Sequence, residues 1–393
     1  MLSAPQTALI KATVPLLESG GEALTSHFYS TMLRDYPEVR PLFNQTHQAS
    51  GAQARALANA VLMYAKFIDR LDALGPLVGQ IVNKHVALQI LPEHYPIVGS
   101  CLLQAIREVL GSEVATDEVI DAWAGAYQQL ANLLMGIEET MYSEREQAEG
   151  GWRGGRQFRL AKKVVESEEI TSFYFVPADG GALMDFEPGQ YIGLRVEIDG
   201  DDLRRNYSLS AAPNQREYRI SVKREKGGRV SGYLHEQLQV GDSVELFPPA
   251  GAFTLRRSDK PLALITAGVG ITPALAMLEH ALDSGRDIHF IHCARHGGVH
   301  GFQDWLAAKA EAHPQLKRFY CYSEPRGEDG HVESGFLTEE RLAQWLPQTR
   351  DMDAYFLGPQ PFMAHVNRSL RGLGVPAEQC FYEFFGPAGK LEG

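Results

Sequence analysis

The sequence predicts three successive folds: an all-α domain, an antiparallel Greek-key β-barrel and an α/β domain with a parallel sheet. The length of 393 residues allows two or three cores at roughly 150 residues each. Only 9 of the 38 glycines fall in residues 1–142, and the hydrophobic period changes twice after that point. We therefore expect domains at 1–142, 153–257 and 258–393, with a linker at 143–152.

The first part carries a helical pattern. Apolar residues recur every three or four positions, as from Leu57 to Ala65 and from Leu77 to Leu88, and prolines stand at plausible helix ends. We expect six to eight helices. The following run SEREQAEGGWRGGRQ collects charge and four glycines, a composition typical of a linker.

After the linker the period becomes two. Runs such as EITSFYFVP, GQYIGLRVEI, REYRISVKRE and DSVELFPP alternate or are rich in β-branched and aromatic residues, which predicts an antiparallel barrel. From Leu262 the pattern becomes strand, glycine turn and helix, and it repeats at RDIHFIHCARH, LKRFYCYSE and DAYFLGP. That repetition predicts a parallel α/β sheet.

Composition narrows the class of partner. The chain is 44% hydrophobic and 22% charged, with a net charge of −12, and its first 150 residues hold 9 basic and 17 acidic side chains. This acidity argues against nucleic acid or an anionic membrane. The uncharged run 261–278 is interrupted by Gly268, Gly270 and Pro273, so we expect no transmembrane segment.

Cysteine usage and the N-terminus indicate the compartment. The four cysteines are far apart and fit neither a C-x-x-C pair nor a zinc spacing, which favours a reducing environment. The N-terminal run lacks the features of a signal peptide. We expect a cytoplasmic monomer.

One histidine of the helical part is a candidate metal ligand. His85 lies on an apolar stripe, where a lone histidine is more often a core residue than a ligand. Tyr29 and Phe43 lie upstream, and Gln53 and Leu57 project from one helix face. His27, His47 and His94 are alternatives that fit less well, because His47 is in a polar loop and His94 follows a proline.

The runs HFYSTML, PEVRPLFNQTHQASGAQ, KHVALQI, PEHYPIVG and DAWAGAYQQLAN resemble the globin domain of the flavohaemoglobins over residues 1 to about 142. The resemblance implies haem b, with His85 as the proximal iron ligand. It further implies that Phe43 wedges the porphyrin, Tyr29 and Gln53 donate hydrogen bonds to the iron's ligand, and Leu57 limits the distal volume. Lys84 matches a position near the haem propionates and the flavin.

The same resemblance makes Tyr95 and Glu138 a pair on the proximal side of the haem. A carboxylate that accepts the Nδ1–H of His85 makes the imidazole more anionic and pushes electron density toward the iron. The residues alone would indicate only a surface hydrogen bond at helix ends.

In the barrel, the run from Arg205 to Ser208 reads R-x-Y-S and resembles the flavin motif of the ferredoxin-reductase-like family. The guanidinium suits pyrophosphate, the tyrosine suits the isoalloxazine face, and a serine suits its N5 edge. About 20 residues on, GGRVS precedes a helix whose N–H groups suit phosphate. A plain strand and an ordinary turn are the alternative. The resemblance implies FAD contacts at Tyr191, Arg205, Asn206, Tyr207, Ser208, Gly227, Gly228, Val230 and Ser231.

The run AGVGITP is a weak dinucleotide signal alone, because Pro273 replaces the third glycine. Its G-x-G-x-T-P form is similar to that of the reductase family, and we expect Thr272 to cap the helix and Pro273 to begin it. Leu357 stands where the family has a cysteine. Arg295 does not discriminate NADH from NADPH by itself. The implied cofactor contacts are Gly268, Val269, Gly270, Ile271, Thr272, Pro273, Gly358 and Pro359, with Glu383, Phe384, Phe385, Gly386 and Pro387 covering the flavin.

These parts fit together as an electron-transfer chain. NADH or NADPH gives up two electrons and haem iron accepts one, so FAD is expected to stand between them. The resemblance implies a nitric oxide dioxygenase acting on O2, NO and NAD(P)H. Alternatives are an NAD(P)H oxidase, a peroxide or ferric reductase and, because no signalling domain follows, less readily a haem gas sensor or oxygen store.

Overall fold

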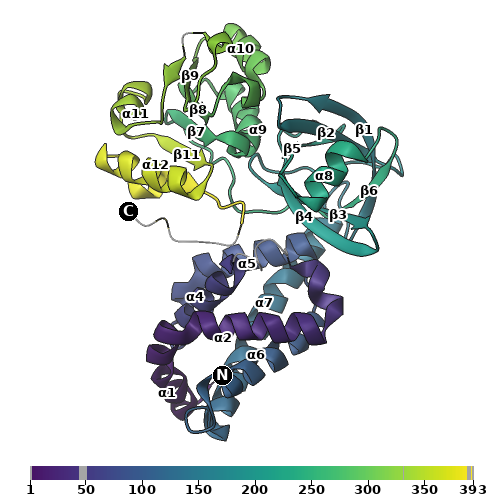
Figure 1. Ribbon diagram of the computed structural model, residues 1–393, viewed down its shortest axis with the longest axis vertical. Helices are drawn as coiled ribbons and strands as arrows, with labels where there is room; N and C mark the ends of the chain where they lie inside the picture. Colours follow the sequence, from purple (N-terminus) through teal and green to yellow (C-terminus); the bar gives the residue numbers. More distant parts are fainter. Residues whose placement is uncertain (1, 44–50, 331, 387–390, 392–393) are drawn as a thin grey trace.

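The computed structural model describes residues 2–43, 51–330, 332–386 and 391. It confirms the predicted fold class in all three parts. A bundle of helices lies at one end of the molecule, and a β-barrel and an α/β unit lie side by side at the other (Figure 1).

The helical part packs around one hydrophobic core. Helix α2 packs against α4 and α6, and α5 and α6 pack against α7. Phe28, Met32 and Trp123 lie in its buried centre. The described residues before Ala148 form six α-helices and two short 3-10 helices: α1 (Ala4–Ala12), α2 (Val14–Asp35), η1 (Pro37–Leu42), α4 (Ala52–Lys66), η2 (Leu71–Leu74), α5 (Gly75–Leu88), α6 (His94–Leu110) and α7 (Asp117–Gln147).

Helix α7 continues into the segment in which the composition indicates a linker. Thr116 caps its start by accepting a hydrogen bond from the Val119 N–H. The helix then runs through Gln147, and Arg145 of its last turn is buried. The Arg145 Nε donates to the Pro249 carbonyl at 2.9 Å, so tertiary contact with the barrel extends the helix beyond what its polar composition favours.

The barrel is a six-stranded antiparallel sheet in the order β4-β3-β6-β1-β2-β5. An isolated bridge between Leu209 and Ile220 joins the end of β4 to β5 and closes the sheet. Phe158, Phe173 and Leu194 fill its interior. Its elements are β1 (Arg156–Val165), β2 (Ile170–Pro177), β3 (Tyr191–Ile198), β4 (Asp201–Ser208), β5 (Tyr218–Lys223), α8 (Arg229–Glu236) and β6 (Ser243–Leu246).

The last part is a parallel sheet in the order β10-β9-β8-β7-β11-β12, covered by α9 and α10 on one face and by α11 and α12 on the other. The central strand β7 is buried at every residue, as expected of a parallel sheet with both faces covered. Its elements are β7 (Leu262–Ala267), η3 (Gly268–Gly270), α9 (Ile271–Ala281), η4 (Leu282–Ser284), β8 (Ile288–Ala294), η5 (Gly297–Val299), α10 (Gln303–Ala312), β9 (Leu316–Tyr322), η6 (Gly327–Asp329), β10 (Glu333–Ser334), α11 (Glu339–Trp345), β11 (Asp353–Leu357), α12 (Gln360–Gly372), η7 (Ala377–Gln379) and β12 (Cys380–Tyr382).

Two neighbouring histidines are buried in the α/β unit. The rings of His292 and His300 lie 4.4 Å apart; His292 Nδ1 is 2.7 Å from the Thr266 hydroxyl and His300 Nδ1 is 2.7 Å from the Tyr322 hydroxyl. Burial lowers the pKa of His292 well below its usual value and that of His300 to about 3. Both rings are therefore neutral in the folded protein at neutral pH.

We expect these histidines to make the α/β unit sensitive to acid. Below about pH 6.5 the unfolded chain takes up protons at these histidines, whereas the folded chain does not. The stabilisation is therefore complete above that pH, and the free energy of unfolding falls toward pH 3 by roughly 1.4 kcal/mol per pH unit for each histidine. Hydrogen exchange of the 288–294 and 316–322 segments, corrected for intrinsic rates, should accelerate from pH 6.5 to 5. The exchange rate of the His300→Gln variant should depend less steeply on pH than that of the unsubstituted protein. Substitution of the exposed His280 should leave the pH dependence unchanged. An equal slope in the unsubstituted protein and both variants would contradict the argument.

Candidate active site

Three helices bring together one histidine, one tyrosine and one carboxylate. His85 Nδ1 on α5 lies 2.7 Å from Glu138 Oε1 on α7, and the Tyr95 hydroxyl on α6 donates to the same oxygen at 2.7 Å. Glu138 is only 2% exposed, whereas the His85 side chain is 30% exposed. Burial and the adjacent carboxylate raise the pKa of Tyr95, so its hydroxyl stays a donor.

This arrangement fixes the tautomer of the imidazole. A neutral histidine has one N–H and one lone-pair nitrogen, and the carboxylate takes the Nδ1–H, so His85 Nε2 carries the lone pair. Among the described residues Nε2 has no hydrogen-bond partner. A histidine held through Nδ1 by a carboxylate, with Nε2 presented elsewhere, is the usual donor arrangement of a metal-bound imidazole, and it fits haem iron.

A second group of candidate residues comes from three segments: Tyr29 lies on α2, Phe43 follows η1, and Gln53 and Leu57 lie on α4. Tyr29 is buried, and its ring centroid is 5.6 Å from that of Phe43. Burial raises the pKa of Tyr29, while a hydrogen bond with Gln53 partly offsets the shift, so the tyrosine remains a protonated donor. Leu57 packs against the same core. The structure therefore brings together the four residues expected on the distal side.

The alternative histidines are engaged elsewhere. His27 pairs with Glu108 at the surface, and His94 Nδ1 accepts a hydrogen bond from the Leu91 N–H at 2.9 Å. His47 lies outside the described residues. Neither His27 nor His94 has a carboxylate-held Nδ1, so His85 is the best candidate ligand among the described histidines of the helical part.

The C-terminal segment after β12 returns to the helical part. Lys84 Nζ donates to the Gly386 carbonyl at 2.8 Å. Burial lowers the pKa of Lys84 and raises that of Glu383 to about 7, each shift being partly offset by the charge of the other residue. Phe384 packs against the α/β core and Phe385 is exposed. Pro387 lies outside the described residues.

The R-x-Y-S run occupies the end of β4 and pairs with the start of β3, so that Tyr191 lies opposite Ser208. Burial raises the pKa of Tyr191 and Tyr207. Asn206 is exposed on the same strand.

Arg205 on the same strand is partly buried. Among the described residues no carboxylate lies within ion-pair distance of its guanidinium, which donates to the Arg204 carbonyl at 2.7 Å, and burial lowers its pKa. A partly buried cation of this kind indicates an anionic ligand, and it fits the pyrophosphate of FAD.

The GGRVS run forms the turn and first residues of α8. Gly227 has a φ of +73°, a conformation that favours glycine, and Gly228 precedes the helix without a side-chain cap. Val230 and Ser231 are buried in the first turn. The Gly228 N–H donates to the Glu225 carbonyl at 3.0 Å, whereas the N–H groups of the first turn of α8 receive no side-chain cap and suit a phosphate.

The GVG run forms η3 at the carboxyl end of β7 and leads directly into α9. A Cβ at Gly270 would lie 2.5 Å from the Leu357 carbonyl oxygen, so only glycine allows this turn to approach the loop of Gly358 and Pro359 so closely. The predicted cap is wrong: α9 begins at Ile271 with Gly270 preceding it, and the Thr272 hydroxyl donates to the Val269 carbonyl instead. The 3-10 turn continues into the helix, which places its start before the threonine.

Arg295, the candidate for a 2′-phosphate, is ion-paired with Glu169 of the barrel. A 2′-phosphate on the nucleotide would have to displace that carboxylate. The neighbouring Arg326 is likewise paired with Glu168, so the arginines at the ends of β8 and β9 are already partly neutralised.

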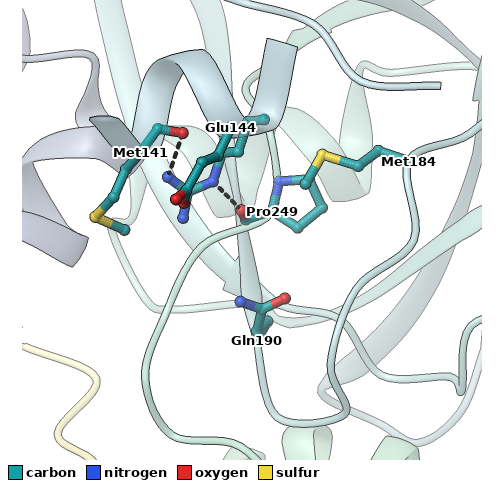
Figure 2. A pocket seen from close by; sticks show the side chains of 6 residues that line it. Met141, Glu144, Met184, Gln190 and Pro249 are labelled. Carbon is teal, nitrogen blue, oxygen red and sulfur yellow. Dashed lines mark hydrogen bonds between the residues drawn. The ribbon is translucent and has the colours of Figure 1, made fainter. Parts of the chain in front are cut away.

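Sequence reasoning missed the residues that dock the helices on the barrel. The Gly251 N–H donates to Asn83 Oδ1 at 3.1 Å, and Arg204 donates to the Leu88 carbonyl at 2.7 Å. A small pocket lies at the same seam (Figure 2), where Arg145 reaches the Met141 and Pro249 carbonyls. These partners are more than 100 residues apart except for Met141, so no local pattern could indicate them.

Comparison with known proteins settles the family. The Globin family model matches residues 26–134, the oxidoreductase FAD-binding domain residues 157–255 and the oxidoreductase NAD-binding domain residues 264–368. The flavohemoprotein of Pseudomonas aeruginosa is 68% identical over 392 residues, and that of a Burkholderia species is 65% identical over 393, each covering 100% of both chains.

The chain belongs to the flavohemoprotein family.

Solved structures support the same family assignment. A flavohemoglobin from Malassezia yamatoensis with bound FAD and haem is 27% identical, with a TM-score of 0.86, over 98% of this chain and 100% of that one. The FAD/NAD-binding domain of nitric oxide dioxygenase from Vibrio cholerae is 40% identical, with a TM-score of 0.56, over 60% of this chain and 100% of that one.

The flavohemoprotein is thus an oxidoreductase with small-molecule ligands, and the predicted cofactors, haem, FAD and a nicotinamide dinucleotide, are confirmed at the level of the three domains. No helix in the described part of this flavohemoprotein is long and apolar enough to cross a bilayer.

One glycine sets the distance between the candidate haem helix and the barrel of the flavohemoprotein. A Cβ at Gly193 of β3 would lie 2.4 Å from the Ala87 carbonyl oxygen of α5 and 2.8 Å from Phe247. We expect Gly193→Ala to displace α5 from the barrel and to slow the reduction of haem by the flavin, because the added Cβ overlaps backbone and ring atoms that must move apart.

Stopped-flow spectroscopy would measure flavin and haem reduction separately in this variant. Flavin reduction by NADH should be unchanged and only haem reduction slowed. Gly79→Ala on the same helix, where an added Cβ meets nothing within 4 Å, is the matched control. Equal haem reduction in both variants would show that the contact does not set the rate.

Proposed function

We propose that this flavohemoprotein is a nitric oxide dioxygenase, which passes electrons from NAD(P)H through FAD to haem and converts NO and O2 to nitrate. The observation that carries the proposal is the 2.7 Å contact between His85 Nδ1 and the buried Glu138. A simple oxygen carrier has no need of an anionic proximal group, whereas oxygen chemistry benefits from it. The Vibrio cholerae structure named as part of a nitric oxide dioxygenase supports the same activity.

We assign the proximal side to three residues. His85 would hold the iron through Nε2. Glu138 accepts the Nδ1–H and keeps the ring in one orientation, and Tyr95 donates to the same oxygen and prevents Glu138 from turning away. Burial of the carboxylate strengthens these hydrogen bonds, because the local dielectric is low.

On the opposite side, the protonated Tyr29 hydroxyl and the Gln53 amide would donate hydrogen bonds to the oxygen substrate. Each hydrogen bond to a charged group is worth about 1.5–3 kcal/mol. Phe43 and Leu57 line the same region with apolar surface, which excludes water.

When bound, FAD separates a two-electron donor from a one-electron acceptor, and haem iron supplies the site at which dioxygen reacts with NO. We assign the pyrophosphate to Arg205, the flavin faces to Tyr191 and Tyr207, and shielding of the flavin to Glu383 and the segment after it, with Lys84 tying that segment to the haem helix. The remaining flavin contacts that we propose are Asn206, Ser208, Gly227, Gly228, Val230, Ser231, Phe384, Phe385, Gly386 and Pro387.

We assign the nicotinamide dinucleotide to the carboxyl edge of the parallel sheet, where ligands of open α/β sheets bind. The close approach of Gly270 to Leu357 brings two loops together at this edge. The residues proposed are Gly268, Val269, Gly270, Ile271, Thr272, Pro273, Gly358 and Pro359. We further propose domains at 1–142, 153–257 and 258–393, and a monomer that acts in the cytoplasm.

Nitrate formation tests the proposed reaction. Mixing the NADH-reduced, air-equilibrated protein with NO should consume NO and yield nitrate stoichiometrically. Persistent NADH oxidation without NO consumption would instead indicate an NAD(P)H oxidase or a peroxide or ferric reductase. The comparison of NADH consumption with and without NO under air distinguishes the two outcomes.

Replacing Glu138 with glutamine tests the proximal pair. The amide keeps the size and one acceptor but loses the charge, so we expect NO turnover to fall roughly tenfold, the lower end of the effect of losing an outer-shell partner. Flavin reduction by NADH should stay unchanged. Glu139→Gln, on the exposed neighbouring position, is the control, and unchanged turnover in Glu138→Gln would show that the pair is only structural.

A further inference from the structure

Two cysteines that are 28 residues apart in sequence meet in the α/β unit. Cys293 of β8 and Cys321 of β9 are register partners on adjacent parallel strands, and their Sγ atoms lie 3.3 Å apart. Both belong to the hydrophobic cluster on the α11 and α12 face of the sheet. Strand register therefore brings together two cysteines that their spacing in the sequence does not associate.

The geometry permits a bond between the two sulfurs. Adjacent strands run about 4.8 Å apart, inside the Cα separation of roughly 4.4–6.8 Å that disulfides span. Closing the present 3.3 Å to a disulfide length of about 2.05 Å requires a sulfur movement of about 1.3 Å, which side-chain rotation can supply. The other thiols, Cys101 on α6 and Cys380 on β12, have no thiol partner among the described residues.

The two thiols differ in exposure and acidity. Cys293 is partly exposed, whereas Cys321 is 1% exposed. The hydrogen bond between them raises the pKa of Cys293, as burial also does, and lowers the pKa of Cys321, which the Arg341 guanidinium lowers further against the effect of burial. The less buried Cys293 gives a small oxidant access to the pair, and Cys321 is the sulfur that ionises more readily.

We propose that Cys293 and Cys321 form a redox-sensitive modification site that hydrogen peroxide converts reversibly to an intramolecular disulfide. In the first step one of the two sulfurs, as the thiolate, attacks a peroxide oxygen, the O–O bond breaks, and sulfenic acid and water form. In the second step the other sulfur displaces the hydroxyl group, which leaves as a second water, and the S–S bond forms. Two thiols lose two hydrogens and one peroxide is reduced.

The location gives the bond a consequence for the fold. Both sulfurs lie near the carboxyl ends of their strands, the edge at which α/β sheets bind ligands. The disulfide would join β8 to β9 just before the turns that contain Arg295 and Arg326, both of which pair with glutamates of the barrel. It would therefore restrain the strands that carry these turns.

Thiol counting on the complete holoprotein tests the proposal, and it does not depend on NO turnover. After mild peroxide treatment, alkylation and intact-mass measurement should find two free thiols in place of the four seen before treatment, and dithiothreitol should restore all four. Peptide mapping should join the segments around residues 293 and 321. Diamide, which oxidises thiols without peroxide, should give the same product and exclude a reaction started at haem.

Variants separate the two steps. Cys321→Ser should form no intramolecular disulfide, and a sulfenic acid left at Cys293 should be detected as a dimedone adduct. Cys293→Ser should lose the disulfide as well, which keeps the test valid if the buried substitution impairs folding, and Cys380→Ser should behave as the unsubstituted chain. Four alkylatable thiols after oxidation, or loss of thiols mapped to Cys101 or Cys380, would overturn the proposal.

Discussion

Replacing Arg205 with alanine is expected to weaken FAD binding by about 100-fold or more. The guanidinium lies at the end of β4, its pKa is lowered by burial, and the described residues offer it no carboxylate. Two charge-assisted hydrogen bonds to pyrophosphate are worth about 3–6 kcal/mol together, and each 1.4 kcal/mol is about tenfold in affinity. The purified variant should therefore lose FAD on gel filtration and retain haem.

Titration of the FAD-depleted variant with FAD, followed by fluorescence quenching, would measure the loss. Arg205→Lys should give an intermediate affinity, because lysine keeps the charge but not the paired donors. Arg195→Ala on the neighbouring strand β3 is the control, since that side chain is exposed and already pairs with Asp202 and Glu245. An unchanged FAD affinity in Arg205→Ala would remove this residue from the cofactor site.

The parts of the fold that could be predicted are the elements with a clear local pattern of apolar and polar residues. The barrel strands follow the alternating runs, and β7 with the GVG turn follows from an apolar run ended by glycines. The start of α9 could not be placed, because Thr272 and Pro273 suit a helix start locally while the 3-10 turn before them continues into the helix. Local preference was outweighed there by the turn that brings Gly270 against Leu357.

The candidate site depended on contacts between distant segments. His85 and Glu138 are 53 residues apart, and no spacing rule joins a histidine on one helix to a carboxylate on another; only the family resemblance indicated the pair. Cys293 and Cys321 show the same limit, because strand register places them side by side. Gly193 and Asn83 carried no local signal, since their roles arise only when α5 docks on the barrel.

Replacing His85 with glycine is expected to abolish NO consumption, and imidazole in the buffer should restore part of it. The substitution removes the proposed iron ligand and leaves a cavity beside the buried Glu138, whose carboxylate can still accept an N–H from a free imidazole. Glycine within a helix costs only about 1 kcal/mol, a minor part of the stability of a domain. The Soret band should be reduced or shifted without imidazole, and flavin reduction by NADH should be unchanged.

The rescue discriminates a ligand from a core histidine. If His85 only packed against Tyr95 and Glu138, free imidazole would restore stability without changing the haem spectrum. If it holds iron, imidazole should restore the spectrum and NO consumption together, with the same concentration dependence. His27→Gly, at a surface residue paired with Glu108, should change neither. Full NO consumption in His85→Gly without imidazole would show that another residue holds the iron, and His94→Ala would then be the next substitution to measure.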